Sequence, residues 1–235
     1  IVAHPEVVMR RMEAWSKHEN YYVRRLASEG CRPRLPWAMA LPAFKEDPSP
    51  VIPILENLKN DPEEYVRKSV ANNLNDLTKD SPEIVIELLS KWSKGATGNT
   101  KWIIKHGLRA MVKSGDLQAL KLLGFKKAKI SIENLNVSKK VQMGGALEFS
   151  FDLQNDGKSK AALVVDYAIH FMKANGNLVP KVFKIKNVKL DSGETVAIKK
   201  SHPIKPITTR KYYPGEQKVS IQVNGEVMGE KSFEL

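Results

Sequence analysis

A repeat with a period of about 40 residues limits the fold of the first half of the chain more than any other feature. The motif Tyr22-Val23-Arg24-Arg25 returns 43 residues later as Tyr65-Val66-Arg67-Lys68, and a looser copy begins at Trp102 after another 37 residues. The stretch before the motif also repeats, because Pro5-Glu6-Val7-Val8 and Pro82-Glu83-Ile84-Val85 each lead to a Trp-Ser-Lys triplet. Unrelated helices would not explain matches in both stretches.

Apolar residues in this half recur at helical spacing, so each unit holds two helices. Two helices in about 40 residues is the period of HEAT and armadillo arrays. We therefore predict a helical-repeat (HEAT-like) solenoid for residues 1–125. The chain begins with Ile1 and not Met, so we expect further repeats before it in a longer protein.

The second half, residues 126–235, changes to the alternating pattern of β-strands. Alternating apolar residues run from Leu147 to Leu153, from Leu163 to Phe171 and from Val219 to Val223, and Asn-Gly or Asp-containing turn signals separate such runs. About seven strands in ~110 residues predict an all-β immunoglobulin-like sandwich. The cysteine pair and core tryptophan of antibody domains are absent, and a small barrel is the alternative.

Charge and composition limit the kinds of partner and binding site that can be expected. The net charge is +12, which indicates an anionic partner, most often nucleic acid and less often a membrane surface or an acidic protein. Cys31 is the only cysteine, which suits a reducing cytosol, and the five histidines lack metal-ligand spacing. No apolar run could span a bilayer. We therefore expect a cytoplasmic, nucleoid-associated monomer without metal or cofactor.

The second helices of the three units carry a stripe of polar residues. Aligning the repeats places Arg25, Lys68 and Lys105 at one equivalent position, and Glu29, Asn72 and Arg109 at the next. Second helices line the concave surface of a solenoid, where a row of cations can follow a phosphate backbone. An ordinary solvated helix face is the alternative.

Two carboxylates, Glu29 and Asp76, lie on this cationic stripe. One explanation is local pairing, such as Arg25 with Glu29. The other is catalysis on the nucleic acid, because cleavage of an N-glycosidic bond builds positive charge on the sugar, and a carboxylate can stabilise that charge and orient water.

A stiff basic connector, residues 30–37, follows the first repeat. Arg32, Arg34 and Trp37 in it could reach a DNA backbone or a cationic base. Trp37 could equally fill a gap between repeats. His106 is more often a packed helix residue than a functional base.

Residues 1 to about 125 resemble the DNA alkylation-repair glycosylases of the AlkC type, relatives of the AlkD type. The resemblance rests on residues 23–30 (VRRLASEG), 32–37 (RPRLPW), 64–76 (EYVRKSVANNLND) and 122–125 (LLGF). Some AlkC-type members also carry a C-terminal immunoglobulin-like domain. Arg25 matches a backbone-contacting arginine of the AlkD type, whereas an AlkD-type tryptophan is replaced by Asn72.

The resemblance implies a glycosylase that removes cationic N-alkylated bases, such as 3-methyladenine and 3-methylcytosine, from duplex DNA without flipping the base. It implies catalytic roles for Glu29 and Asp76, and a sandwich that clamps the DNA. The predicted DNA-binding residues are Arg25, Arg32, Arg34, Trp37, Arg67, Lys68, Asn72, Asn73, Lys105, His106 and Arg109. The alternatives are a non-catalytic DNA-binding or scaffold array and an array that binds acidic proteins.

Overall fold

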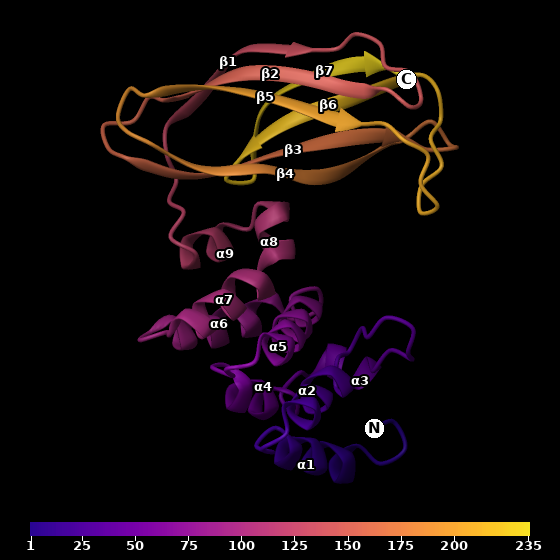
Figure 1. The fold of residues 1–235 in the computed structure, drawn as a ribbon, viewed down its shortest axis with the longest axis vertical. Coiled ribbons are helices and arrows are strands. Elements are labelled where there is room, and N and C mark those ends of the chain that lie inside the picture. Colours follow the sequence, from indigo (N-terminus) through magenta and orange to yellow (C-terminus); the bar gives the residue numbers. More distant parts are fainter. The chain divides into compact units, whose positions relative to one another are not determined.

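Helices fill the first half of the chain and strands fill the second, as the change in periodicity predicts (Figure 1). The computed structural model describes all residues 1–235. The last helix ends at Leu122 and the first strand begins at Ile130, on either side of the predicted boundary at 125/126. Chain contacts divide the molecule slightly earlier, into Ile1–Val112 and Lys113–Leu235.

Six of the helices form three sequential pairs. The pairs are α1 (Pro5–Trp15) with α2 (Tyr21–Gly30), α4 (Ile52–Leu58) with α5 (Glu64–Leu77), and α6 (Pro82–Ser93) with α7 (Gly98–Gly107). The second helices also pack on one another, α2 against α5 and α5 against α7. Each first helix has a proline in its first turn, where the missing N–H costs no hydrogen bond.

Short helices join or follow these pairs: α3 (Pro42–Glu46), α8 (Arg109–Ser114) and α9 (Leu117–Leu122). The second helix of the third pair is interrupted, because α7 ends at Gly107 and α8 starts separately at Arg109. A Cβ on Gly107 would lie 3.1 Å from the Leu74 Cβ, so glycine permits the close approach of α7 to α5. None of the helices combines the length and apolar character that crossing a membrane requires.

The packed face of α5 carries Val66, Val70, Leu74 and Leu77, all of which are buried. The first repeat differs. Tyr22 and Leu26 of α2 are 60% and 51% exposed, because α2 turns Ala27 and Ser28 inward.

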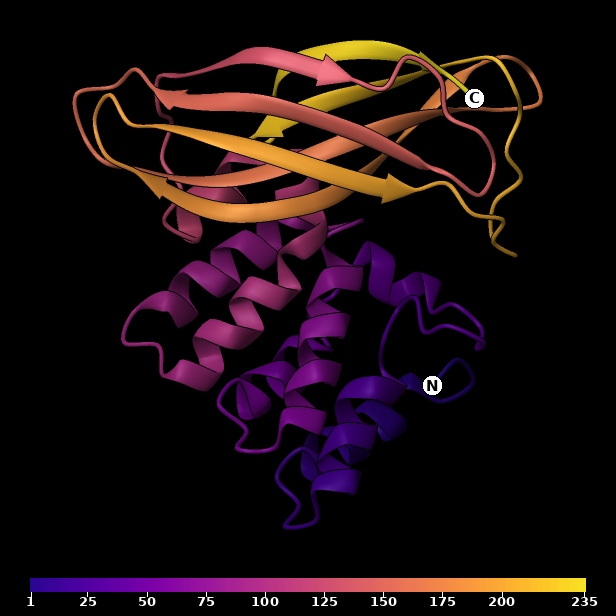
Figure 2. The same cartoon turned by 45° about the horizontal axis from the view of Figure 1, so that its top comes forward.

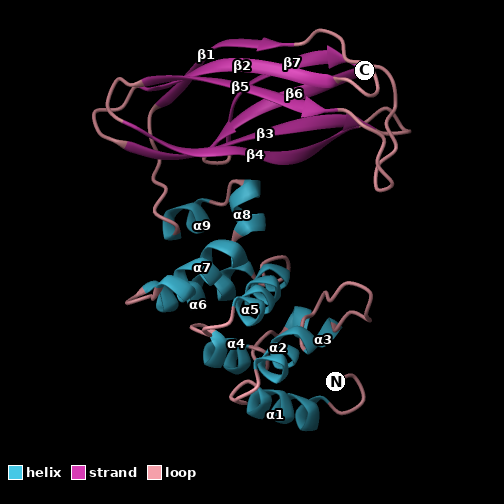
Figure 3. Cartoon of the chain, in the orientation of Figure 1, coloured by secondary structure: helices cyan, strands magenta, loops and turns pink.

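The second unit is a sandwich of two antiparallel sheets (Figure 3). One sheet has the order β1-β2-β5, with β1 (Ile130–Val137), β2 (Ala146–Asn155) and β5 (Thr195–Pro203). The other has the order β4-β3-β6-β7, with β4 (Leu178–Leu190), β3 (Ala161–Met172), β6 (Glu216–Val223) and β7 (Glu226–Glu234). Two separate sheets exclude the small barrel.

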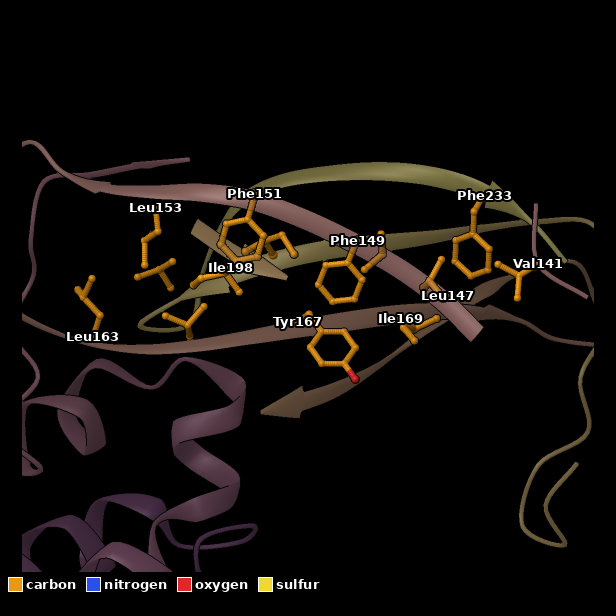
Figure 4. Packing of buried hydrophobic residues seen from close by; sticks show 14 of the residues in the cluster. Val141, Leu147, Phe149, Phe151, Leu153, Leu163, Tyr167, Ile169, Ile198 and Phe233 are labelled. Carbon is orange, nitrogen blue, oxygen red and sulfur yellow. The ribbon is translucent and has the colours of Figure 1, made fainter. Parts of the chain in front are cut away.

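The alternating residues of the sequence form the core between the sheets. Phe149 and Phe151 of β2 face Tyr167 and Ile169 of β3, and all are buried (Figure 4). The predicted Asn-Gly turn between β6 and β7 has positive φ at both Asn224 (48°) and Gly225 (78°), as a two-residue hairpin requires.

Candidate active site and nucleic-acid interface

The two predicted catalytic carboxylates are joined through one arginine. Glu29 lies in the last turn of α2 and Asp76 in the last turn of α5, and the packing of these helices brings them to opposite sides of Arg32. The Arg32 Nη1 donates to Glu29 Oε1 at 2.8 Å, and its Nε donates to Asp76 Oδ2 at 2.9 Å. The Nη2 also lies 2.9 Å from Asp76 Oδ2. Glu29, Asp76 and Arg32 therefore form one unit, here called the carboxylate cluster.

Each carboxylate in the cluster keeps one oxygen that Arg32 does not bind. Glu29 Oε2 is buried without a hydrogen bond and lies 3.6 Å from the Arg25 Nη2. Asp76 Oδ1 lies 3.8 Å from the Lys79 Nζ, beyond hydrogen-bond distance. Buried polar atoms without partners are uncommon and often mark functional sites. Glu29 Oε2 is therefore a buried acceptor that no hydrogen bond satisfies, whereas Asp76 Oδ1 lies within ion-pair distance of Lys79.

Because the carboxylate cluster is largely shielded from water, the attraction between Arg32 and the two carboxylates is strong. The side chains of Asp76 and Glu29 are only 6% and 17% exposed. Burial by itself would lower the pKa of Arg32, but hydrogen bonds and charge from Asp76 and Glu29 outweigh it and raise that pKa above its ordinary value. Arg32 therefore stays charged and holds both carboxylates in place.

Arg32 itself was predicted to contact DNA, and the structure places it within the carboxylate cluster. It is 8% exposed, and its guanidinium is occupied by the two carboxylates.

Asn73 and Arg67, also predicted to contact DNA, face the protein instead. Asn73 is fully buried, and its Nδ2 donates to the Ser28 carbonyl at 2.9 Å. The Arg67 Nη1 donates to the carbonyls of Asp61 (2.9 Å) and Pro62 (2.5 Å), in the turn before its own helix. Arg24, at the equivalent repeat position, binds the carbonyls of His18 and Glu19 in the same way. These arginines fix the turns within the helix pairs.

Cys31, beside the cluster, has no nucleophilic role in this state. Its side chain is buried, and burial raises the pKa of the thiol to about 12. Its Sγ donates to the Ala27 carbonyl at 3.2 Å. A neutral, enclosed thiol cannot attack a substrate.

The cations of the predicted stripe differ in whether a neighbouring acidic side chain pairs with them. The Arg25 guanidinium lies over the Tyr65 ring at 4.1 Å from its centroid, which holds it beside Glu29. Local pairing of Glu29 with Arg25, one of the two explanations, is present in the structure, and the catalytic explanation stays a prediction. Lys105 is exposed without an ion pair, whereas Lys68 pairs with Glu64 at 2.8 Å.

Asn72 and Arg109, predicted at equivalent positions of successive repeats, are in contact. The Arg109 Nη2 donates to Asn72 Oδ1 at 2.9 Å. Burial lowers the pKa of Arg109, and the nearby charge of Arg32 lowers it further, although Asp76 acts the other way. The stripe therefore extends from the carboxylate cluster across α5 to α8.

The remaining predicted DNA contacts divide into paired and free side chains. Arg34 is exposed and forms a bidentate pair with Asp80, at 3.0 and 2.6 Å. His106 is half-buried and stacks on Trp102 at 3.8 Å, as a packed helix residue does. Trp37 is fully exposed with φ at 66°, so it does not fill a gap between repeats. A large indole held away from the protein is available to a ligand.

Replacing Trp37 with Ala is expected to change the free energy of unfolding by less than ~0.5 kcal/mol, because the exposed indole packs on nothing, while affinity for duplex DNA falls. Thermal unfolding and fluorescence anisotropy measure the two effects. Trp92→Ala is the matched control: Trp92 is 4% exposed and its Nε1 donates to Glu56, so ~3–5 kcal/mol of stability is expected to be lost. Unchanged DNA affinity in Trp37→Ala would remove Trp37 from the interface.

Two residues of the site were not predicted. Tyr65 supports Arg25, and Lys79 lies near the free oxygen of Asp76. The repeat of tyrosine at positions 22 and 65 was a visible signal for the first, and nothing in the sequence pattern indicated the second. No group of His, Cys, Asp and Glu side chains in residues 1–235 could hold a metal ion.

Comparison with known proteins defines the class of each unit. Residues 1–111 match the family described as "DNA alkylation repair enzyme", and residues 131–235 match the family described as "Uncharacterised protein YhaZ, C-terminal Ig-like domain". The helical unit therefore matches the DNA alkylation repair enzyme family, and the sandwich matches a family of C-terminal immunoglobulin-like domains.

Two individual proteins are similar over nearly the whole chain. The uncharacterized protein YhaZ of Bacillus subtilis (strain 168) is 45% identical over 232 residues, which are 98% of this chain and 64% of YhaZ. The alkylpurine DNA glycosylase AlkC of Pseudomonas fluorescens, solved bound to DNA containing an abasic site analog, is 43% identical with a TM-score of 0.94. That match covers 97% of this chain and 64% of AlkC, so the chain spans somewhat less than two thirds of both relatives.

Proposed function

We propose that this protein is a DNA glycosylase that hydrolyses the N-glycosidic bond of cationic N-alkylated bases, such as 3-methyladenine and 3-methylcytosine, in duplex DNA. The observation that carries the proposal is the carboxylate cluster, in which Glu29 and Asp76 each keep one oxygen free of Arg32. The similarity to AlkC, an alkylpurine DNA glycosylase, supports it. We further propose that the helix pairs are HEAT-like repeat units whose second helices face the DNA.

The chemistry matches the available groups. When the bond breaks, its electron pair moves to the alkylated base and cancels the positive charge there, while positive charge develops at C1′ and O4′ of the sugar. A cationic base leaves without a proton donor, which agrees with the lack of an acid in the cluster. The carboxylates of Glu29 and Asp76 would stabilise the sugar cation. Water then adds to C1′ and gives its proton to one of these carboxylates.

The bases need not leave the stack for these steps. The developing charge is on the sugar, at the edge of the duplex, so carboxylates beside the backbone can reach it. Arg25, Lys105 and Arg109 would hold the phosphates around the lesion. We propose duplex DNA as the partner, a monomeric protein and action in the cytoplasm at the nucleoid.

Release of free bases from methylated DNA tests the proposal directly. DNA treated with a methylating agent is incubated with the protein, and the soluble products are separated by chromatography. Release of 3-methyladenine and 3-methylcytosine is the expected result. A non-catalytic DNA-binding array, the second candidate, would bind DNA in a salt-sensitive manner and release no base.

A further inference from the structure

The amide of Asn72 has a fixed orientation, because Arg109 binds one end of it. The Arg109 Nη2 donates to Asn72 Oδ1 at 2.9 Å. A guanidinium group can only donate hydrogen bonds, so the amide atom that faces Arg109 has to be the oxygen. The Asn72 Nδ2, which carries two N–H donors, therefore points away from Arg109, and it binds no other group of the protein.

Contacts of α7 and α8 with α5 hold Arg109 in this place. α7 packs along α5, and α8 follows α7 after a short break (Figure 2). The Ala110 N–H donates to Asn75 Oδ1 at 3.3 Å, which ties the start of α8 to α5. The Arg109 Nη1 also donates to the His106 carbonyl at 2.6 Å. Both ends of the guanidinium are thus anchored, and the Asn72 amide cannot turn over without breaking a charge-assisted hydrogen bond.

The donors of Asn72 lie one helical turn from a carboxylate of the proposed active site. Asn72 and Asp76 are four residues apart on α5, so their Cβ atoms are neighbours at about 5–6 Å. Asn72 is half-buried, which leaves its amide partly open to a ligand. A sugar whose C1′ lies beside Asp76 therefore brings the atoms next to its glycosidic bond toward the Asn72 amide.

The two lesions of the proposed function differ at the atom beside the glycosidic bond. In 3-methylcytosine the carbonyl oxygen O2 is bonded to C2, the neighbour of N1, and it faces the minor groove as an acceptor. In 3-methyladenine the corresponding minor-groove atom is N3, which carries the methyl group and has no lone pair for a hydrogen bond. An amide donor at this place therefore distinguishes the two bases.

We propose that the Asn72 Nδ2 donates a hydrogen bond to O2 of 3-methylcytosine and so accelerates release of this lesion, an inference that rests on the glycosylase function proposed above. When the bond between C1′ and N1 breaks, its electron pair moves into the base, and the cationic 3-methylcytosine leaves as a neutral molecule. Electron density at O2 rises in this step, so the hydrogen bond is stronger in the transition state than in the bound substrate. Asn72 transfers no proton and is a specificity-determining residue.

Two substitutions at position 72 separate this role from the contact with Arg109. Asn72→Leu has nearly the same shape and lacks both the donors and the acceptor. Asn72→Asp lacks the donors but keeps an oxygen for Arg109. The control, Asn99→Leu, removes a half-buried asparagine of α7 that is not part of the stripe and whose Nδ2 donates to the Asp61 carbonyl at 3.4 Å. Single-turnover rates are measured on a duplex with one 3-methylcytosine and on methylated duplex DNA, from which 3-methyladenine is released.

Both Asn72 variants are expected to release 3-methylcytosine at least ~tenfold more slowly relative to 3-methyladenine, the effect of losing one hydrogen bond made in the transition state. In Asn72→Leu the rate for 3-methyladenine is expected to stay within ~twofold, and Asn99→Leu is expected to keep both rates within ~twofold, because neither change removes a contact with those transition states. For Asn72→Asp the ratio of the two rates is decisive, since an added carboxylate near the sugar favours both reactions. Equal losses for both lesions in Asn72→Leu, or an unchanged rate for 3-methylcytosine, would overturn the proposal.

Failure of the specificity role and failure of the function give different results. An unmodified protein that releases neither base refutes the glycosylase function, and the role of Asn72 with it. A protein that releases both bases, with the same ratio of rates in Asn72→Leu, keeps the function and loses only the specificity role. Release of 3-methyladenine without 3-methylcytosine by the unmodified protein overturns the role of Asn72 while the glycosylase activity stands.

Discussion

Glu29→Gln and Asp76→Asn are each expected to lower the single-turnover rate of 3-methyladenine release by ~10²–10³-fold, the usual effect of removing one group that stabilises transition-state charge. Each substitution keeps the shape of the side chain and removes its negative charge. The Kd for undamaged duplex DNA is expected to stay the same or decrease slightly, because less negative charge then faces the phosphates. Release of the free base and anisotropy measure the two quantities.

Glu64→Gln provides the matched control, since Glu64 is an exposed carboxylate on the same helix as Asp76 and pairs only with Lys68. We expect its excision rate to stay within about twofold of the unmodified protein, because exposed pairs contribute little. Wild-type excision by both Glu29→Gln and Asp76→Asn would show that the carboxylate cluster is not the active site.

Arg32→Gln is expected to lower the free energy of unfolding by ~3–5 kcal/mol and to abolish measurable excision, because it leaves two buried carboxylates without their shared partner. Arg32→Lys tests whether Arg32 positions the two carboxylates, apart from its effect on the free energy of unfolding. An ammonium group retains the charge but cannot donate along the three directions that Arg32 uses toward Glu29 and Asp76. We expect the lysine variant to bind DNA within about twofold of the unmodified protein and to excise at least ~tenfold more slowly.

Arg34→Gln is the control for Arg32, because Arg34 also forms a bidentate pair, with Asp80, but at an exposed position. Its effect on stability is expected to stay below ~1 kcal/mol. Thermal unfolding and single-turnover kinetics distinguish the variants. If Arg32→Lys bound and excised normally, Arg32 would have no positioning role.

The sequence predicted the architecture well because periodicity reports directly on buried faces. The repeats became helix pairs, and the alternating runs of Leu147–Leu153 and Leu163–Phe171 became facing strands of the core.

The side-chain roles were harder to predict, because they depend on contacts between repeats. Arg32 follows the end of α2, so the helical pattern gives no direction for its side chain, and only Asp76 of the next pair determines it. Asn73 was predictable: with Val66, Val70 and Leu77 it falls on the helical spacing of the buried face of α5. The side chain of the preceding residue, Asn72, points about 100° around the helix axis from that of Asn73. It therefore lies on the stripe, where it accepts a hydrogen bond from Arg109.

Because the two carboxylates come from different helix pairs, their spacing depends on how α2 packs against α5. Glu29 moves with α2 and Asp76 with α5, so any bending between these pairs changes the spacing of the two carboxylates. Ser28 and Ser69, both fully buried, join the helices through a hydrogen bond of 2.7 Å between their hydroxyls. This buried hydrogen bond ties α2 to α5 close to the carboxylate cluster, so under the function proposed above the packing of successive helix pairs would set the distance between the two carboxylates.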